Sequence, residues 1–172
     1  MRVIGIDPGL TRCGIAVISA AHPSRPQLLG LGVVRSSPDL ELPMRLLVLE
    51  EGLGEWFDEY EPTSVAVERV FAQNNLASVM GTGQAAGVAM LVAARRQLPV
   101  SLYTPSEAKA AITGSGRADK AQVGFMVSRI LGLAKSPKPA DAADAVALAM
   151  CHLWRGGGAS RVEQAARRAA IR

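Results

Sequence analysis

The start of the chain shows three apolar blocks separated by short polar turns. Met1–Asp7 is apolar up to an Asp-Pro-Gly turn, which is typical of a buried strand. Apolar residues dominate again over Cys13–Ala20 and over Gln27–Arg35. Strands joined by such short connections form a meander, so we expect three antiparallel neighbours.

The remainder of the chain alternates between helical and strand-like patterns. Apolar residues at helical spacing predict a helix over Leu40–Tyr60, whose opposite face is acidic and therefore solvated. The elements expected after it are a strand over Thr63–Glu68, a loop over Arg69–Asn75, a helix over Ala77–Gln97, a strand over Pro99–Thr104, the start of a short helix over Glu107–Ile112, and helices over Asp119–Leu131 and Ala140–Trp154. Gly156-Gly-Gly158 is expected to end the last helix. This order predicts an α/β layer fold with a mixed sheet.

Length and composition favour a single domain. The chain has 172 residues, of which 49% are hydrophobic and 20% charged, so it can bury a core. We expect the domain to span residues 1–156 and a basic, flexible tail to span 157–172. The longest apolar stretch, Ala85–Ala94, is too short for a membrane span of about 20 residues, and the start of the chain does not match a signal peptide. Cys13 and Cys151 match neither a disulfide framework nor zinc spacing, so a cytoplasmic location is expected.

Charge is distributed unevenly along the chain. The sequence has 19 Lys and Arg against 15 Asp and Glu, a net charge of +4. Residues 155–172 carry five arginines and one acid, and residues 69–154 carry nine bases and four acids. A basic second half with a basic tail favours a polyanionic partner such as nucleic acid. A solubilising surface with a loose tail would give the same counts, so charge alone leaves both interpretations open.

Four carboxylates border or interrupt apolar segments. Asp7 and Glu68 end predicted strands, and Asp141 and Asp144 lie three residues apart on one face of a predicted helix. Three of these acids also have a purely structural explanation. Asp7 could be a turn residue, Glu68 a strand end that faces solvent, and Asp141 an acid favoured in the first turn of a helix. Asp144 interrupts a run of Ala, Val and Leu, where an unpaired buried carboxylate would be costly.

If these four side chains lie close together, cations are required to neutralise their negative charge. Carboxylates at close range repel one another unless positive charge neutralises them. Hard oxygen ligands suit Mg²⁺ or Mn²⁺, and a pair of such ions about 3.5–4 Å apart is an arrangement that hydrolyses phosphodiesters. The spacing suggests such a site but does not show that the side chains meet.

Five short motifs, spread along nearly the whole chain, resemble the RuvC family of bacterial Holliday junction resolvases. They are Gly5-Ile-Asp-Pro-Gly9, Val67-Glu-Arg-Val-Phe71, Gly83-Gln-Ala-Ala-Gly87, Asp119-Lys-Ala-Gln-Val123 and Asp141-Ala-Ala-Asp-Ala145. The resemblance implies a ribonuclease H-like fold with a five-stranded mixed sheet flanked by helices. It also implies a crossover junction endodeoxyribonuclease of homologous recombination and DNA repair. Such an enzyme acts as a homodimer, nicks two opposed strands of a four-way junction, and leaves 5′-phosphate and 3′-hydroxyl ends.

The resemblance assigns catalysis to four residues and names partners. Asp7, Glu68, Asp141 and Asp144 match the family's catalytic acids, and all four are intact. By the same resemblance they would bind two Mg²⁺ ions, for which Mn²⁺ can substitute. The family works with the RuvA–RuvB branch-migration complex, and no membrane partner is implied.

Other residues match the family's DNA contacts or are weaker candidates for that role. They are Phe71, Lys109, Lys120, Arg69, Arg117 and Arg129. Lys120 has an alternative as a surface pair with its neighbour Asp119. For Phe71, stacking on a junction base competes with core packing against Val70.

Glycines in the helix predicted over Ala77–Gln97 let another backbone approach closely. The resemblance places Gly81, Gly83 and Gly87 at a dimer interface, whereas packing of the same helix on its own sheet is the alternative. Although Gly81-Thr-Gly83-Gln-Ala-Ala86 fits a loose dinucleotide-binding pattern, it does not follow a strand, so we reject that interpretation. Many relatives carry basic residues where this chain has Gly81 and Ala86, so a phosphate or interface contact is expected to be missing here.

Three other functions compete with the resolvase. The motif from Gly5 to Thr11 also resembles the first phosphate loop of sugar kinases and actin-like ATPases, but a second lobe does not fit in 172 residues. A non-catalytic junction-binding module would not need the four acids. A ribonuclease H-like nuclease acting on RNA is disfavoured by the match over Val67–Phe71 and by the spacing of Asp141 and Asp144.

Overall fold

The computed structural model describes residues 1–70 and 76–170, with side chains described for 1–70 and 79–155. Phe71 therefore lies outside the described residues. The strands are β1 (Arg2–Asp7), β2 (Arg12–Ser19), β3 (Gln27–Arg35), β4 (Ser64–Glu68) and β5 (Val100–Tyr103). The helices are α1 (Leu42–Tyr60), α2 (Leu76–Arg95), α3 (Pro105–Thr113), α4 (Lys120–Leu131) and α5 (Ala140–Ala170). Each predicted strand and helix is present, with ends shifted by a few residues in most cases.

The five strands form one mixed sheet in the order β3-β2-β1-β4-β5. Neighbours within β1–β3 pair antiparallel, because short turns join them. β4 pairs parallel with both β1 and β5; α1 leads from β3 across to β4, and α2 connects β4 to β5. The predicted mixed sheet is confirmed.

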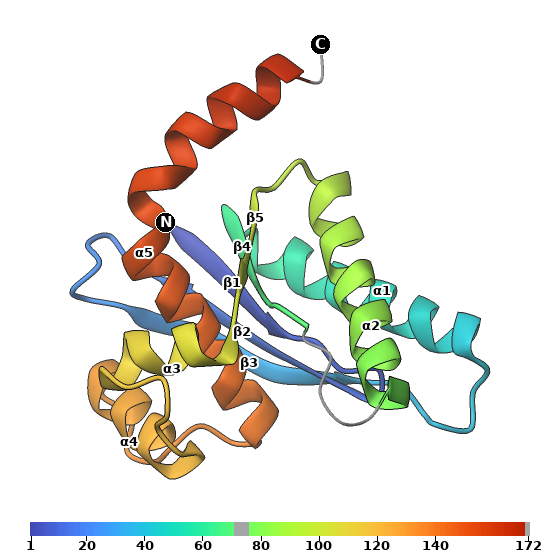
Figure 1. Cartoon of the computed structure of the whole chain (residues 1–172), viewed down its shortest axis with the longest axis horizontal. Coiled ribbons are helices and arrows are strands. Elements are labelled where there is room, and N and C mark those ends of the chain that lie inside the picture. Colours follow the sequence, from blue (N-terminus) through green and yellow to red (C-terminus); the bar gives the residue numbers. More distant parts are fainter. Residues whose placement is uncertain (71–75, 171–172) are drawn as a thin grey trace.

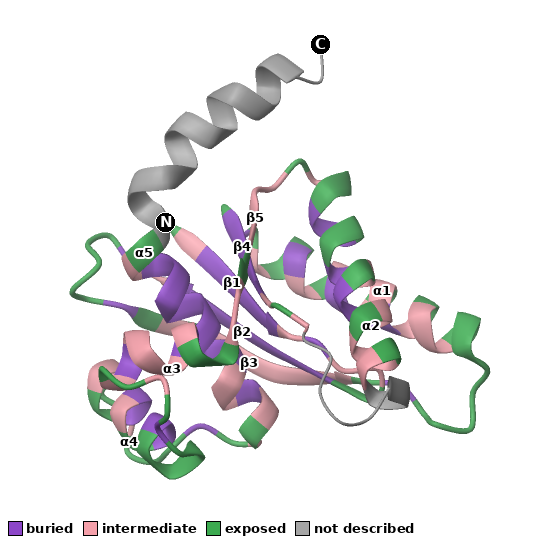
Figure 2. Cartoon of the chain, viewed as in Figure 1, coloured by how far each residue is buried: buried purple, intermediate pink, exposed green. Residues whose placement is uncertain are grey.

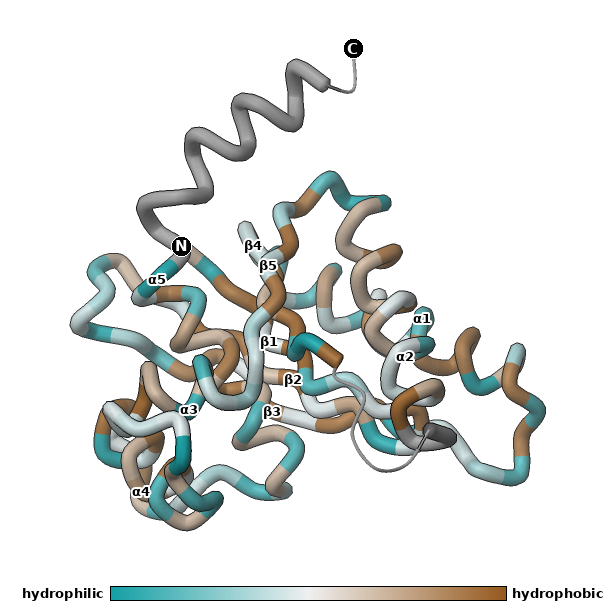
Figure 3. The backbone as a smooth tube through the Cα atoms, viewed as in Figure 1, coloured by the Kyte–Doolittle hydropathy of each residue, from teal (hydrophilic) through white to brown (hydrophobic). Residues whose placement is uncertain are grey.

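Helices cover both faces of this sheet (Figure 1). Alternate strand residues face opposite sides, so Ile4 and Ile6 pack toward α1 and α2, whereas Val3 packs toward α3, α4 and α5. The central strands β1, β2 and β4 and residues 145–153 of α5 are mostly buried, whereas β3 and β5 are mostly of intermediate exposure (Figure 2). Hydrophobic residues accordingly follow the strands at the centre of the molecule (Figure 3).

The α5 face of the sheet contains small residues that let the helix approach the strands closely. A Cβ atom added to Gly5 would overlap the carbonyl oxygen of Ala145, and one added to Gly14 would overlap that of Asp141. No side chain larger than hydrogen fits at either position unless α5 moves. The position of α5 is therefore set by direct contact with the backbone of β1 and β2.

The predicted end of the last helix at Gly156 is wrong, because α5 continues to Ala170. Glycine lowers helix stability by about 1 kcal/mol relative to alanine but keeps its backbone N–H, so three glycines do not force a stop. The alanine-rich residues that follow are good helix formers.

No helix in the described part of the chain is long and apolar enough to cross a membrane. Both cysteines are buried and free.

One buried histidine on α5 should make stability depend on pH. His152 is 2% exposed, and its Nδ1 lies 3.0 Å from the hydroxyl of Tyr103. Burial lowers the pKa of His152 below its usual value of 6.5. The unfolded chain then binds more protons just below pH 6.5, so the histidine's contribution to stability is complete above that pH and is lost as the pH falls toward the folded-state pKa.

When the pH is lowered from 7.5 to 5.5, we expect the change in urea midpoint to be less favourable in the wild type than in His152→Gln, which does not titrate there. Comparison with the variant removes the contribution of other titrating groups. Parallel pH profiles for the two proteins would show that His152 does not control this dependence.

Candidate active site

Two of the four carboxylates lie at the carboxyl ends of adjacent parallel strands. Asp7 is the last residue of β1 and Glu68 the last residue of β4. The register pairs Ile6 with Val67, so the two acids follow neighbouring positions at the same edge of the sheet. This edge is where parallel strands place functional side chains in α/β folds.

Helix α5 brings the other two carboxylates to the same edge. Asp141 lies in its first turn, and Asp144 follows one turn later. The start of the helix contacts Gly14, which pairs with Asp7 across the β1–β2 ladder. A single glycine thus touches the backbone of Asp141 and lies opposite Asp7.

The electrostatics show that the four groups are close enough to interact. Burial, followed by the negative charges of Glu68, Asp144 and Asp141, raises the pKa of Asp7 to about 8, and Lys120 opposes this shift. Burial and Asp144 likewise raise the pKa of Glu68. The structure therefore gathers the predicted acids into one anionic site that disfavours its own ionisation.

Two cationic side chains already occupy part of this site. Arg12 Nε donates to Asp141 Oδ2 at 2.6 Å, and Lys120 Nζ donates to Asp144 Oδ2 at 3.1 Å. The bond to Asp144 raises the pKa of Lys120. Within the described residues, no three His, Cys, Asp or Glu side chains are grouped closely enough to coordinate one ion.

Lys120 contacts the site rather than its sequence neighbour. Asp119 caps α4, accepting from the backbone N–H of Gln122 at 2.8 Å, while Gln122 Oε1 accepts from the N–H of Asp119 at 2.9 Å. The alternative of a surface pair between Asp119 and Lys120 is therefore wrong.

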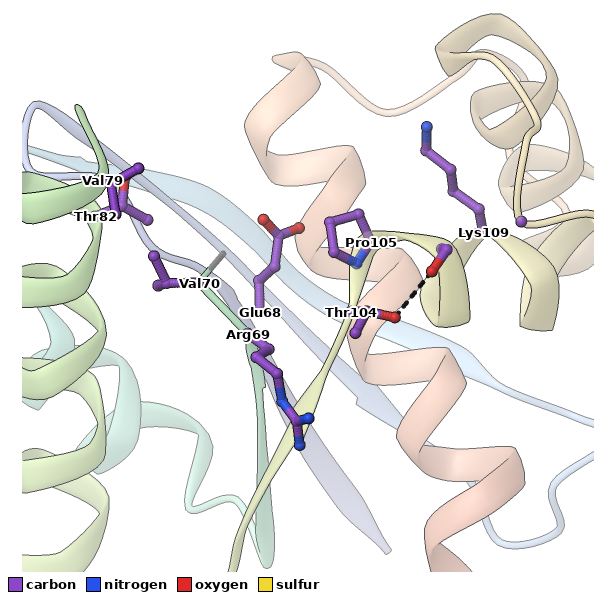
Figure 4. Close-up of a pocket in the computed structure, with 10 residues that line it drawn as sticks. Glu68, Arg69, Val70, Val79, Thr82, Thr104, Pro105 and Lys109 are labelled. Carbon is purple, nitrogen blue, oxygen red and sulfur yellow. Dashed lines mark hydrogen bonds between the residues drawn. The ribbon is translucent and has the colours of Figure 1, made fainter. Parts of the chain in front are cut away.

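A groove of about 620 Å³ borders Glu68 on the side of α3. Lys109 lines it, and its ammonium lies on the same side of the groove as the carboxylate of Glu68, whereas Arg69 extends in the opposite direction (Figure 4). Lys109 and Lys120 both lower the pKa of Glu68, against the larger effects of burial and Asp144. Lys109 and Lys120 thus lie at the edge of the acidic site, and their predicted role in DNA contact stays a prediction.

Other predicted residues lie elsewhere. Arg117 lines a separate groove with Phe125 of α4, and the guanidinium of Arg129 lies 5.9 Å from the Phe125 ring. Gly81 faces Leu10 of its own chain, and Ala86 is 5% exposed. A basic residue in place of Ala86 would therefore not extend from an open surface of the single chain, and one in place of Gly81 would pack beside Leu10.

Sequence reasoning missed two cationic residues at the site. One is Arg12, whose partner is 129 residues away along the chain, so local spacing gives no signal of it. The other is Lys138, which lines a groove of about 340 Å³ together with Lys120 and Asp144. Its position between Pro137 and Pro139 was the available clue, since these prolines mark the entry to the acidic helix.

Comparison with known proteins identifies the family. The family model of crossover junction endodeoxyribonuclease RuvC matches residues 3–152. The chain belongs to the RuvC family. A RuvC from Thermobifida fusca (strain YX) is 62% identical over 165 residues, covering 96% of this chain and 91% of that protein. A RuvC from Cutibacterium acnes is also 62% identical, covering 95% of this chain and 84% of that protein.

Solved RuvC structures share the fold, which is ribonuclease H-like. The structure of Thermus thermophilus RuvC in complex with Holliday junction substrate aligns with a TM-score of 0.85 at 33% identity, covering 95% of this chain and 97% of that one. Another Thermus thermophilus RuvC structure aligns with a TM-score of 0.82 at 36% identity, covering 91% and 95%. The predicted fold class and RuvC resemblance are confirmed.

Proposed function

We propose that this chain resolves Holliday junctions by hydrolysing one phosphodiester in each of two opposed strands. The observation that carries the proposal is the anionic site at the edge of β1 and β4, where neighbouring carboxylates and burial raise the pKa of Asp7 to about 8. Membership of the RuvC family and likeness to a junction-bound RuvC support four-way DNA as the substrate. The products would carry 5′-phosphate and 3′-hydroxyl ends.

The donor set fits two divalent cations. Asp7, Glu68, Asp141 and Asp144 offer only carboxylate oxygens, which suit Mg²⁺, with Mn²⁺ as a substitute. The two resident side-chain cations leave net negative charge among the four acids, so added positive charge would relieve the repulsion. Bound ions of this kind activate water and stabilise a leaving oxygen.

The remaining side chains bind and orient the strand. Lys109 lies in the groove beside Glu68, and Lys138 lies in the groove beside Asp144, so the two grooves border the acids from two sides. A strand entering along one groove and leaving along the other would place a phosphate over the carboxylates. Lys120, which extends from the start of α4 to Asp144, would neutralise charge at that phosphate. The roles predicted for Phe71, Arg69 and Arg117 stay predictions.

A second copy of the chain would supply the second cut. Residues exposed along one side of α2 are apolar or small: Met80, Gly83, Gly87, Met90, Leu91 and Ala94. Nothing lies within 4 Å of a Cβ added at Gly83 or Gly87, so packing within the chain does not explain these glycines. A two-fold dimer through this face matches the two-fold symmetry of a junction. By contrast, Gly81 faces its own chain and contributes less to this surface.

The α2 face gives a direct test of dimerisation. We expect Gly87→Arg to raise the dimer dissociation constant by at least about 10-fold, because a long cation would enter a close apolar contact. Sedimentation velocity measures this, with Leu47→Arg as a control at an exposed apolar residue of α1. Equal dissociation constants for the wild type and Gly87→Arg would place the dimer interface elsewhere.

The family also implies a setting for the reaction. We propose that the protein acts in the cytoplasm, on chromosomal junctions processed by a RuvA–RuvB branch-migration complex. A reducing compartment suits its two free, buried cysteines.

Cleavage of a synthetic four-way junction, with linear duplex as control, tests the proposal. Symmetric nicks on the junction with Mg²⁺ or Mn²⁺, and none with Ca²⁺ or EDTA, are the expected result. Junction binding without cleavage under any metal would indicate a non-catalytic binding module. Cleavage of RNA in place of the junction would indicate the other ribonuclease H-like activity.

A further inference from the structure

Arg12 is positioned to act on the acidic site, although it is not itself an acid of that site. It is the first residue of β2, next to the turn that follows Asp7. Its Nε donates to Asp141 Oδ2 at 2.6 Å, with 41% of the arginine side chain and 31% of the aspartate side chain exposed. The guanidinium of Arg12 stays charged at any pH at which the protein is folded, so loss of a proton from the arginine does not break this ion pair.

The sheet itself does not explain an arginine at this position. Arg12 lies directly opposite Arg35 in the β2–β3 ladder, and residues opposite one another in an antiparallel pair project from the same face. Like charges in that arrangement are destabilising. The pairing with Asp141 offsets this cost.

We propose that Arg12 is a positioning residue that acts as the resident counter-ion of Asp141 and competes with a divalent cation for that carboxylate. The inference rests on the proposed metal site. In the metal-free protein, Arg12 holds Asp141 near the other acids despite their mutual repulsion. Binding of a divalent cation at Asp141 requires that this hydrogen bond be given up, so the ion pair weakens metal binding while stabilising the metal-free fold.

Manganese binding to the metal-free, full-length protein, followed by isothermal titration calorimetry, tests this role without any DNA cleavage. We expect Arg12→Gln to bind Mn²⁺ about fivefold more tightly than the wild type, the size expected for loss of one partly exposed ion pair. Arg12→Lys keeps a competing cation and should stay within about twofold of the wild type. Arg35→Gln removes the same charge from the facing ladder position, which has no bond to a site carboxylate among the described residues, and should also stay within about twofold.

A thermal scan provides the second readout. Metal-free Arg12→Gln should melt below the wild type, and the rise caused by saturating Mn²⁺ should be larger in the variant. Equal Mn²⁺ affinity in the wild type and Arg12→Gln would overturn the competition. An equal gain in Arg35→Gln would show that only overall charge matters, which also overturns it. Absence of Mn²⁺ binding in all four proteins would overturn the proposed metal site itself.

Discussion

Replacing Asp7 with asparagine is expected to lower junction cleavage by at least about 10³-fold while junction binding persists. Asp7 is partly buried, and the charges of the other three acids all act on it, so it lies at the electrostatic centre of the site. Asparagine keeps the shape but removes a charged oxygen ligand. Lys109 and Lys120 remain in place to bind phosphate, so junction binding should persist.

The same substitution should stabilise the metal-free protein at neutral pH. Burial and the neighbouring acids hold the pKa of Asp7 at about 8 in the folded protein, against an ordinary value of 3.8. Between these values the folded state binds more protons than the unfolded state, so the free energy of unfolding falls as the pH rises. Asparagine does not titrate and avoids this loss. The melting temperature of Asp7→Asn should therefore exceed that of the wild type at pH 7.5, and the difference should shrink as the pH falls.

Single-turnover cleavage, junction binding and thermal melting on the same preparations separate these effects. Asp39→Asn, at an exposed acid between β3 and α1, is the matched control and should behave as the wild type in all three measurements. Retained cleavage in Asp7→Asn would remove Asp7 from the reaction. Lost cleavage accompanied by a lower melting temperature would point instead to damage of the fold.

Local sequence was enough to predict the sheet and its helices. Each of the first three strands is a short apolar block bounded by a polar turn, and these features act over a few residues. The glycines of 156–158 misled the prediction for α5 because a low helix propensity is a small local cost, which neighbouring alanines can offset. Patterns of a few residues thus predict where elements form better than where they end.

The sequence indicated which acids form the site, but it did not indicate which cationic side chains pair with them. Asp144 drew attention because a carboxylate in an apolar run needs a partner, and the structure supplies Lys120. That partner comes from α4, and the partner of Asp141 comes from β2, so both ion pairs depend on tertiary packing. Spacing along the chain shows which acids share a helix face, whereas only the folded chain shows which cations approach them.

Gly14→Ala is expected to lower cleavage about 10²-fold and to destabilise the fold by about 1–3 kcal/mol. The added methyl group would overlap the carbonyl oxygen of Asp141, and backbone atoms cannot rotate away as a side chain can. The start of α5 must then shift outward from β2. Because Gly14 also lies opposite Asp7, this shift separates Asp141 from the acid at the centre of the site.

Gly54→Ala is the matched control for this prediction. A Cβ at Gly54 would meet only the end of the flexible Arg96 side chain, at 3.6 Å, and alanine is favoured over glycine inside a helix such as α1. Urea unfolding and single-turnover cleavage should show this control at or above wild-type stability with unchanged activity. If Gly14→Ala is destabilised yet cleaves at the wild-type rate per folded molecule, then the close contact of α5 with β2 serves the fold alone. A loss of rate that persists when the protein is fully folded would instead show that this contact sets the distance between the helix acids and the strand acids.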